Sequence, residues 1–190
     1  WQLMRYALLV LLTAVLFATN CQQEEESTRN RDAMFPSSMT SYSTRLHPNQ
    51  DIMSELLNRV KKYKLKAVSV VSAIGSVLHC SIRFANNSYL TRVEGPMEIV
   101  SLSGTVDEHQ RPHVHISLSN GTGFTIGGHL PSLTERKTPA NHDCPIFTTL
   151  ELVLVEHNNV RYVRKTDPET TFDELTIQRR GTFSVQLGQM

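Results

Sequence analysis

The sequence lacks the short motifs that mark the common nucleotide-dependent and acyl-transfer enzymes. It contains no Walker-type phosphate loop, no Gly-x-Gly-x-x-Gly fingerprint and no Gly-x-Ser-x-Gly elbow. These absences argue against a P-loop NTPase, a dinucleotide-dependent enzyme and an α/β-hydrolase. Cysteine is scarce, with three in the chain, and none lies in a nucleophile signature. The sequence therefore names no catalytic residue and leaves open whether the protein is an enzyme.

The sequence also lacks an excess of charge of either sign. It has 19 basic and 18 acidic side chains, and Arg5 is the one charged residue among the first twenty. The rest of the chain is consequently neutral, and a neutral domain has no electrostatic attraction for a nucleic acid backbone. DNA is therefore not an expected partner.

No hydrophobic run reaches the roughly 20 residues of a transmembrane helix. The longest candidate is the twelve-residue run from Ala7 to Ala18, which follows Met4 and Arg5 and precedes small and polar residues. This layout is typical of a secretory signal peptide, which we place at residues 1–21. It predicts a secreted or lumenal protein, with an uncleaved signal that anchors the chain in a membrane as the alternative.

Sequons and cysteines are compatible with that compartment. Asn86 and Asn120 each begin an Asn-x-Ser/Thr triplet and are candidate glycosylation sites. Cys80 and Cys144 could form a disulfide in an oxidising environment. Because Cys80 lies in an apolar run, a buried free thiol is an equally reasonable expectation, and both alternatives stay open at this point.

The chain divides into segments of different composition. Residues 22–43 are polar and lack periodicity, which predicts a flexible linker. The folded domain is expected at residues 44–178, followed by a loose tail at residues 179–190.

One helix and many strands are expected in this domain. The helix should run from Asp51 to Tyr63, capped by Asn49 or Asp51, with its apolar side chains on one face. Beyond Lys66 the chain consists of short β-type runs separated by turn signals such as Gly75 and Gly95-Pro96. This order predicts an α+β fold with a mixed, largely antiparallel sheet packed against a helix.

Three histidines stand out between Gly95 and Leu130. His113 and His115 are one residue apart in a strand-like run, so both imidazoles should leave the same face of a sheet. His129 follows Gly127-Gly128, which permits a close approach of the backbone. Three imidazoles are typical ligands of zinc or another divalent transition metal, with a fourth position open to water or a small ligand.

Glu98 is a candidate supporting residue for this site. It could orient a histidine from behind or act as a general base toward metal-bound water. Alternation with Met97 and Ile99 would instead place it on the surface, and the surface position is the commoner one for a single glutamate.

Several longer segments carry a resemblance to a known family. The segments are LHPNQDIMSELLNRV, VVSAIGSVLHCSIRFAN, EGPMEIVSLSGTV, PHVHISLSNGTGFTIGGHL and VRKTDPETTFDEL. In this order they resemble the plants and prokaryotes conserved (PPC) domain over about residues 44–177. The resemblance implies an antiparallel sheet with a helix, assembled as a homotrimer. The resemblance implies different functions in different members. Plant members carry AT-hooks and bind DNA. Single-domain prokaryotic members have no settled activity, and some resemble metal proteins.

The chain departs from that family in ways that affect function. It has no AT-hook, since it contains no Arg-Gly-Arg-Pro core and the nearest basic segment, Gln178 to Gly181, cannot supply the arginine pair that an AT-hook inserts into the minor groove. It has a long loop from Pro131 to Pro145 that adds His142 and Asp143 near the histidines. Two functions follow as hypotheses: a trimeric metal-binding domain that takes a small ligand, or a trimeric protein-interaction module in which the histidines are structural.

Overall fold

The computed structural model describes residues 33–136 and 143–181, and all the elements named below lie in one compact unit, Pro36–Met190. The predicted signal peptide at residues 1–21 lies outside the described residues, as does the predicted tail at residues 179–190 from residue 182 onward. Within the described ranges, no helix is long and apolar enough to cross a membrane.

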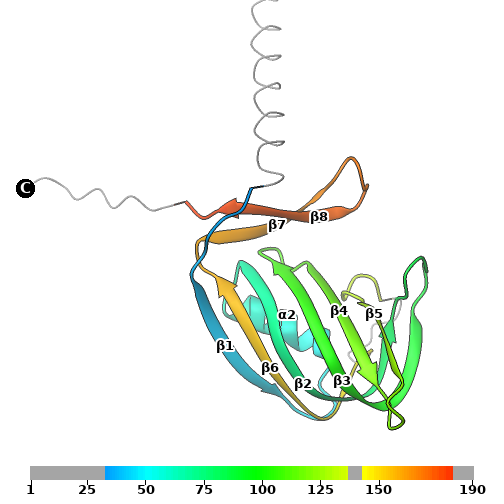
Figure 1. The fold of residues 1–190 in the computed structure, drawn as a ribbon. Coiled ribbons are helices and arrows are strands. Elements are labelled where there is room, and N and C mark those ends of the chain that lie inside the picture. Colours follow the sequence, from blue (N-terminus) through cyan, green and yellow to red (C-terminus); the bar gives the residue numbers. More distant parts are fainter. Residues whose placement is uncertain (1–32, 137–142, 182–190) are drawn as a thin grey trace, which may run out of the picture. The chain divides into compact units, whose positions relative to one another are not determined.

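A six-stranded sheet and one helix form the main body (Figure 1). The strand order is β1-β6-β2-β3-β4-β5, and each neighbouring pair is antiparallel. This confirms the predicted α+β class. The elements are β1 (Met39–Leu46), α2 (Ile52–Lys62), β2 (Ala67–Ile82), β3 (Thr91–Asp107), β4 (Pro112–Ser119), β5 (Thr125–Leu130) and β6 (Ile146–His157).

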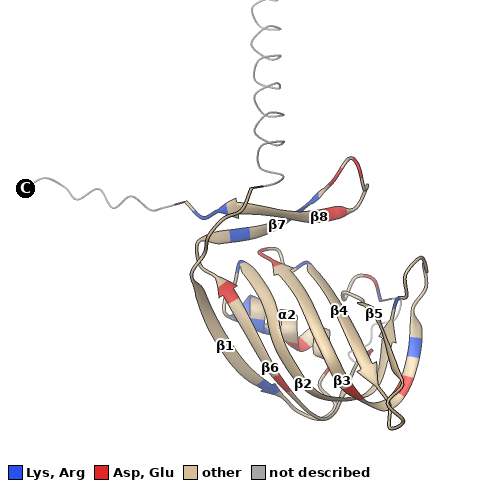
Figure 2. Ribbon diagram, in the orientation of Figure 1, with Lys and Arg blue, Asp and Glu red and all other residues tan. Residues whose placement is uncertain are grey.

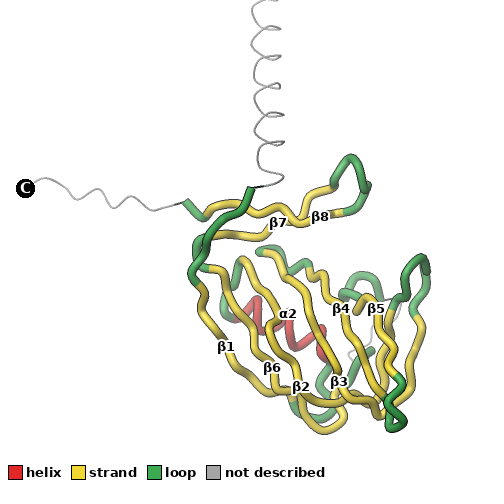
Figure 3. The backbone as a smooth tube through the Cα atoms, viewed as in Figure 1, coloured by secondary structure: helices red, strands yellow, loops and turns green. Residues whose placement is uncertain are grey.

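Helix α2 lies against one face of this sheet (Figure 3). Asp51, one of the two caps that the sequence predicted, accepts a hydrogen bond from the backbone N–H of Ser54 at 2.9 Å. The apolar face of the helix is buried in the core that it shares with β2, β4 and β6, through Ile52, Met53, Leu56, Leu57 and Val60.

Strands β2 and β3 are longer than the sequence predicted, because two expected turns lie inside them. At Gly75 the chain stays in β2, and an added Cβ would stand 1.9 Å from the carbonyl oxygen of Thr149 in β6. This glycine therefore marks a close approach of two strands. Gly95-Pro96, a cis peptide, lies within β3 opposite a register shift between Val77 and His79. A proline cannot donate to the ladder, so it is tolerated at such an irregularity.

Strand β1 begins inside the segment predicted to be a linker. Residues Met39 to Leu46 pair with His157 to Leu150 of β6, so the folded domain starts before Thr44. The sequence of this segment is polar and did not indicate a strand, because β1 is an edge strand with most of its side chains exposed. Hydrophobic alternation is weak where one flank and one face meet solvent.

A separate two-stranded ribbon follows the main sheet, formed by β7 (Val160–Thr166) and β8 (Asp173–Arg179). Asp107, buried at the end of β3, holds it in place: its carboxylate accepts a hydrogen bond from the backbone N–H of Arg164 at 3.1 Å and binds the guanidinium of Arg111 at 2.8 Å. The ribbon therefore lies beside the start of β4, where the first histidine stands.

Cys80 and Cys144 form a disulfide and are both fully buried in the core. Of the two alternatives that the sequence left open, the structure has the bridge. Next to it, Asp51 accepts hydrogen bonds from the backbone N–H of Cys144 and from Nη1 of Arg136, both at 3.0 Å. The described ends of the long loop are thus attached to the start of α2.

Candidate metal centre

The three predicted histidines lie together on neighbouring strands. His113 and His115 leave the same face of β4, and His115 stands directly opposite His129 of β5. The ligand atoms of the three side chains all lie within 4.8 Å of one another, and the ring centroids are 5.2 to 5.6 Å apart. The placement predicted from strand alternation is confirmed.

Two glycines allow β5 to bring His129 into this position. A Cβ at Gly127 would stand 2.6 Å from the carbonyl oxygen of Ile116, and one at Gly128 would stand 2.6 Å from that of Arg83. Side chains at either position would separate the strands. The Gly-Gly pair therefore acts as the sequence suggested, by admitting neighbouring backbone.

His129 carries a polar atom that its protein surroundings leave unsatisfied. Nδ1 is buried and has no hydrogen-bond partner among the described residues, whereas Nε2 lies 3.2 Å from both carboxylate oxygens of Glu135. A buried ring nitrogen without a partner is costly unless something binds it. In metal proteins, one histidine nitrogen binds the ion while the other is oriented by a carboxylate. The donor set fits a divalent transition metal.

The surroundings of the cluster favour the neutral form of the imidazoles over the protonated form. Burial, followed by the nearby charges of Arg164, His115 and His129, lowers the pKa of His113. Burial, with His129 and Arg83, lowers the pKa of His115. A metal binds the neutral ring, so a lowered pKa keeps these nitrogens available at more acidic pH than usual.

Glu135 is held as a carboxylate beside His129. The hydrogen bond with His129 is the main reason why the pKa of Glu135 is lowered to about 2, and burial opposes it. The backbone N–H of Ser132 also donates to this carboxylate at 2.7 Å. The sequence analysis missed Glu135, although it lies in the long loop already noted for its place after His129.

The structure places Glu98 away from the histidines. Glu98 is exposed and pairs with Ser119, four residues from His115 along β4, which is about 13 Å at the usual rise of a strand. The supporting carboxylate is Glu135 instead, because it follows β5 directly. Asp143 lies 3.1 Å from Nε of Arg136, and His142 lies outside the described residues.

The glycosylation candidates are both exposed, in turns. Asn86 has a positive φ of 61° in the segment between β2 and β3. Asn120 lies between β4 and β5, where its side-chain oxygen accepts hydrogen bonds from Thr122 and Phe124.

Known proteins resemble this chain over the same region. The model of the Plants and Prokaryotes Conserved (PCC) domain matches residues 34–140. A curated relative, the bifunctional protein GlmU of a Synechococcus strain, is 34% identical over 145 residues. That alignment covers 76% of this chain but 21% of the relative, so the chain spans about a fifth of the relative's length.

Solved structures share the fold. A hypothetical protein from Salmonella enterica is 30% identical, with a TM-score of 0.69 over 78% of this chain and 99% of its own. A metal-containing protein from Archaeoglobus fulgidus is 22% identical, with a TM-score of 0.60 over 75% of this chain and 98% of its own. A candidate DNA-binding protein from Bacteroides thetaiotaomicron is 19% identical, with a TM-score of 0.56 over 75% and 97%.

At these last two identities the likeness concerns the fold alone. The family model, however, matches more than half of the chain, and the solved structures include a plant- and prokaryote-conserved protein from Pyrococcus horikoshii, with a TM-score of 0.57 and 20% identity over 78% of this chain and 99% of its own. The resemblance seen in the histidine motifs is thereby confirmed: the chain belongs to the Plants and Prokaryotes Conserved domain family.

Proposed function

We propose that this domain binds a divalent transition metal, with zinc as the first expectation, at His113, His115 and His129, and offers an open coordination position to a small ligand. The buried, unpartnered Nδ1 of His129 carries the proposal, because nothing else in the described structure satisfies that atom. A metal-containing protein with the same fold supports it.

The residues around the three histidines have separate roles in this proposal. The imidazoles bind the ion, and Glu135 fixes the orientation of the His129 ring through Nε2. A metal held by three histidines acts as a Lewis acid toward a ligand at its open position. No described side chain is assigned a catalytic step.

Metal analysis of the purified protein tests this function. We expect about one equivalent of zinc per chain after loading and desalting at pH 7.5. Protons compete with the metal for the imidazoles, so occupancy should fall on acidification. Because the pKa values of His113 and His115 are lowered, the fall should begin below about pH 6.5, the ordinary histidine value. Absence of stoichiometric metal at pH 7.5 would contradict the proposal.

We also propose that the domain assembles as a homotrimer through the sheet face opposite α2. Ile74 pairs with Glu151, whose neighbours Leu150 and Leu152 point into the core, so Ile74 lies on the outer face. This residue is 64% exposed, and central strands carry other exposed apolar side chains, at Val71, Val100 and Phe147. Figure 2 shows few charges along the strands of this sheet. Such a face is typical of a protein interface.

Light scattering at micromolar concentration tests the assembly. We expect three times the chain mass for the wild-type protein and a smaller mass for Ile74→Glu, since a charge on a buried apolar interface is costly. Tyr63→Glu, at an exposed apolar residue after α2 on the helix side, is the matched control and should stay trimeric. A monomeric wild-type protein would sink this proposal.

We propose a secreted or lumenal location for the mature chain. The Cys80–Cys144 disulfide supports it, since such bridges persist in oxidising compartments. Intact-mass and N-terminal analysis of protein recovered from the medium of a eukaryotic culture tests it, together with glycans at Asn86 and Asn120. Recovery of the chain in the membrane fraction, with Met4 to Ala18 retained, would speak for the membrane-anchored alternative.

A further inference from the structure

A cavity of about 900 Å³ opens beside the three histidines, within the size range of small-molecule sites. His113 and His129 form part of its wall, and the rest comes from α2, the residue after β2, the turn between β3 and β4, the loop after β5 and the β7–β8 ribbon. Two further cavities in the described part of the chain have volumes of about 350 Å³ each, and none of the three histidines lines them.

Both signs of charge line this cavity, but the negative charges are already engaged. Its carboxylates are those of Glu135, Asp173 and Glu174. Glu135 interacts with His129, Asp173 accepts a hydrogen bond from Thr166 at 2.7 Å, and Glu174 accepts one from Thr170 at 3.1 Å. Each acidic group therefore has a protein partner, and the four basic side chains of the lining, those of Lys61, Arg83, Arg111 and Arg164, outnumber its three carboxylates.

Two of the basic groups retain unused donors. Arg164 donates to the carbonyl oxygen of Asp173 and to the hydroxyl of Thr105, which pairs with His113, but its buried Nε has no partner among the described residues. Arg164 is only 8% exposed. Arg164 and His113 both line the cavity.

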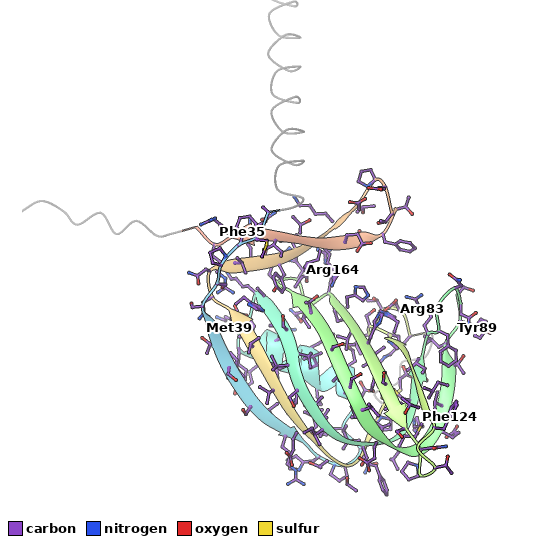
Figure 4. The ribbon with its side chains drawn as sticks, in the orientation of Figure 1. Phe35, Met39, Arg83, Tyr89, Phe124 and Arg164 are labelled. Atoms are coloured by element: carbon purple, nitrogen blue, oxygen red, sulfur yellow. A yellow bond between two sulfur atoms is a disulfide. The ribbon has the colours of Figure 1, made fainter. Side chains whose placement is uncertain are left out.

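Arg83 is held beside His129 by its backbone. Its N–H donates to the carbonyl oxygen of His129 at 2.9 Å, and the reverse bond measures 3.0 Å. In the described part of the chain, the guanidinium of Arg83 has neither a hydrogen bond nor an ion pair, yet it is half-buried and lines the cavity. Figure 4 shows Arg83 and Arg164 reaching the same end of the sheet from different elements.

Apolar side chains complete the wall. Leu133 and Phe172 line the cavity and are 44% and 71% exposed, so they have apolar surface left to cover. A ligand that fits both groups combines a charged oxygen group with an apolar body.

We infer that the ligand of this cavity is a small organic anion, with a carboxylate or phosphate group at the metal and the arginines and an apolar part against Leu133 and Phe172. The guanidinium of Arg83 supplies a forked pair of donors that matches such oxygens. The inference rests on the proposed metal centre, because the ion adds the positive charge that the three neutral imidazoles lack.

Calorimetric titration of the zinc-loaded protein tests this inference. Benzoate, phenyl phosphate and benzamide serve as probes, since benzamide has the shape of benzoate without its charge. We expect benzoate or phenyl phosphate to bind at least about tenfold more tightly than benzamide, and the comparison of the two anions distinguishes a carboxylate site from a phosphate site. A hydrogen bond to a charged group accounts for a factor of this size.

Variants locate the anion. Arg83→Gln should weaken anion binding about tenfold or more, leave benzamide binding unchanged and keep one zinc per chain; Arg83→Lys, which keeps the charge, should lie between. Arg45→Gln is the matched control, because Arg45 is exposed on β1 at the opposite edge of the sheet. The melting temperature of each variant shows that it is folded.

The outcomes separate this inference from the metal function. If zinc binds with full stoichiometry but benzoate, phenyl phosphate and benzamide bind alike, or Arg83→Gln has no effect, the anion site is wrong and the metal centre stands. If zinc does not bind at all, the proposed function fails first, and the same titration on the metal-free protein shows whether the arginines attract an anion alone.

Discussion

His129→Ala is expected to lower zinc affinity by about a hundredfold or more, which makes it the most damaging substitution at the metal centre. The substitution removes one of the three protein bonds to the ion. The bonds of a protein zinc site together contribute on the order of 10 kcal/mol to the free energy of metal binding. The variant also removes the side chain that Glu135 orients. Competition with a fluorescent zinc chelator measures the affinity.

Glu135→Gln should have a smaller effect on zinc affinity than His129→Ala. The amide still reaches Nε2 of His129 but lacks the negative charge, so zinc affinity should fall about 10- to 100-fold while the ligand set stays complete. His47→Ala, at an exposed histidine after β1, is the matched control and should bind zinc like the wild type. Equal affinities for His129→Ala and the wild type would exclude the centre described above.

Reduction of the Cys80–Cys144 disulfide is expected to lower the free energy of unfolding by about 4 kcal/mol. The bridge joins residues 64 positions apart, and cross-linking a loop of that length mainly restricts the unfolded chain. Denaturant titration with and without reductant measures the difference, provided that unfolding is reversible and two-state.

A double substitution controls for the chemistry of the reductant. Cys80→Ala with Cys144→Ala should unfold like the reduced wild type, and reductant should have no further effect on it. A difference below about 1 kcal/mol between the oxidised and reduced wild type would contradict the expectation.

Local patterns correctly predicted part of the histidine cluster. His113 and His115 could be placed on one face because side chains alternate along a strand, and that rule needs no tertiary information. The position of His129 was less determined by local pattern: Gly127-Gly128 indicated a close backbone approach, and the family resemblance indicated its place beside the other two histidines. The register that sets His115 opposite His129 is a property of the folded sheet.

Local sequence patterns could not identify Glu135. It lies in a loop without periodicity, and its position depends on the neighbouring Arg136, which binds Asp51 at the start of α2. The sequence separation between those two residues is too large for any local pattern. Glu98, by contrast, has the exposed position that its alternation with Met97 and Ile99 indicated.

The predicted boundaries of β2 and β3 were wrong for a related reason. Gly75 and Gly95 were interpreted as turn residues, whereas both stand inside long strands where neighbouring backbone comes close. Glycine favours turns and close approaches for the same lack of a side chain, so only the neighbouring strand distinguishes the two. The pairing of Cys80 with Cys144 likewise depended on the fold.

The two backbone hydrogen bonds between Arg83 and His129 protect the edge of the sheet at β5. Strand β5 is the last in the sheet order and would normally offer unpaired backbone groups to another chain. At His129, however, the N–H and the carbonyl oxygen that face outward are both taken by Arg83. An incoming strand therefore cannot add to the sheet at this point, and the third histidine is shielded from association that would pull it out of register.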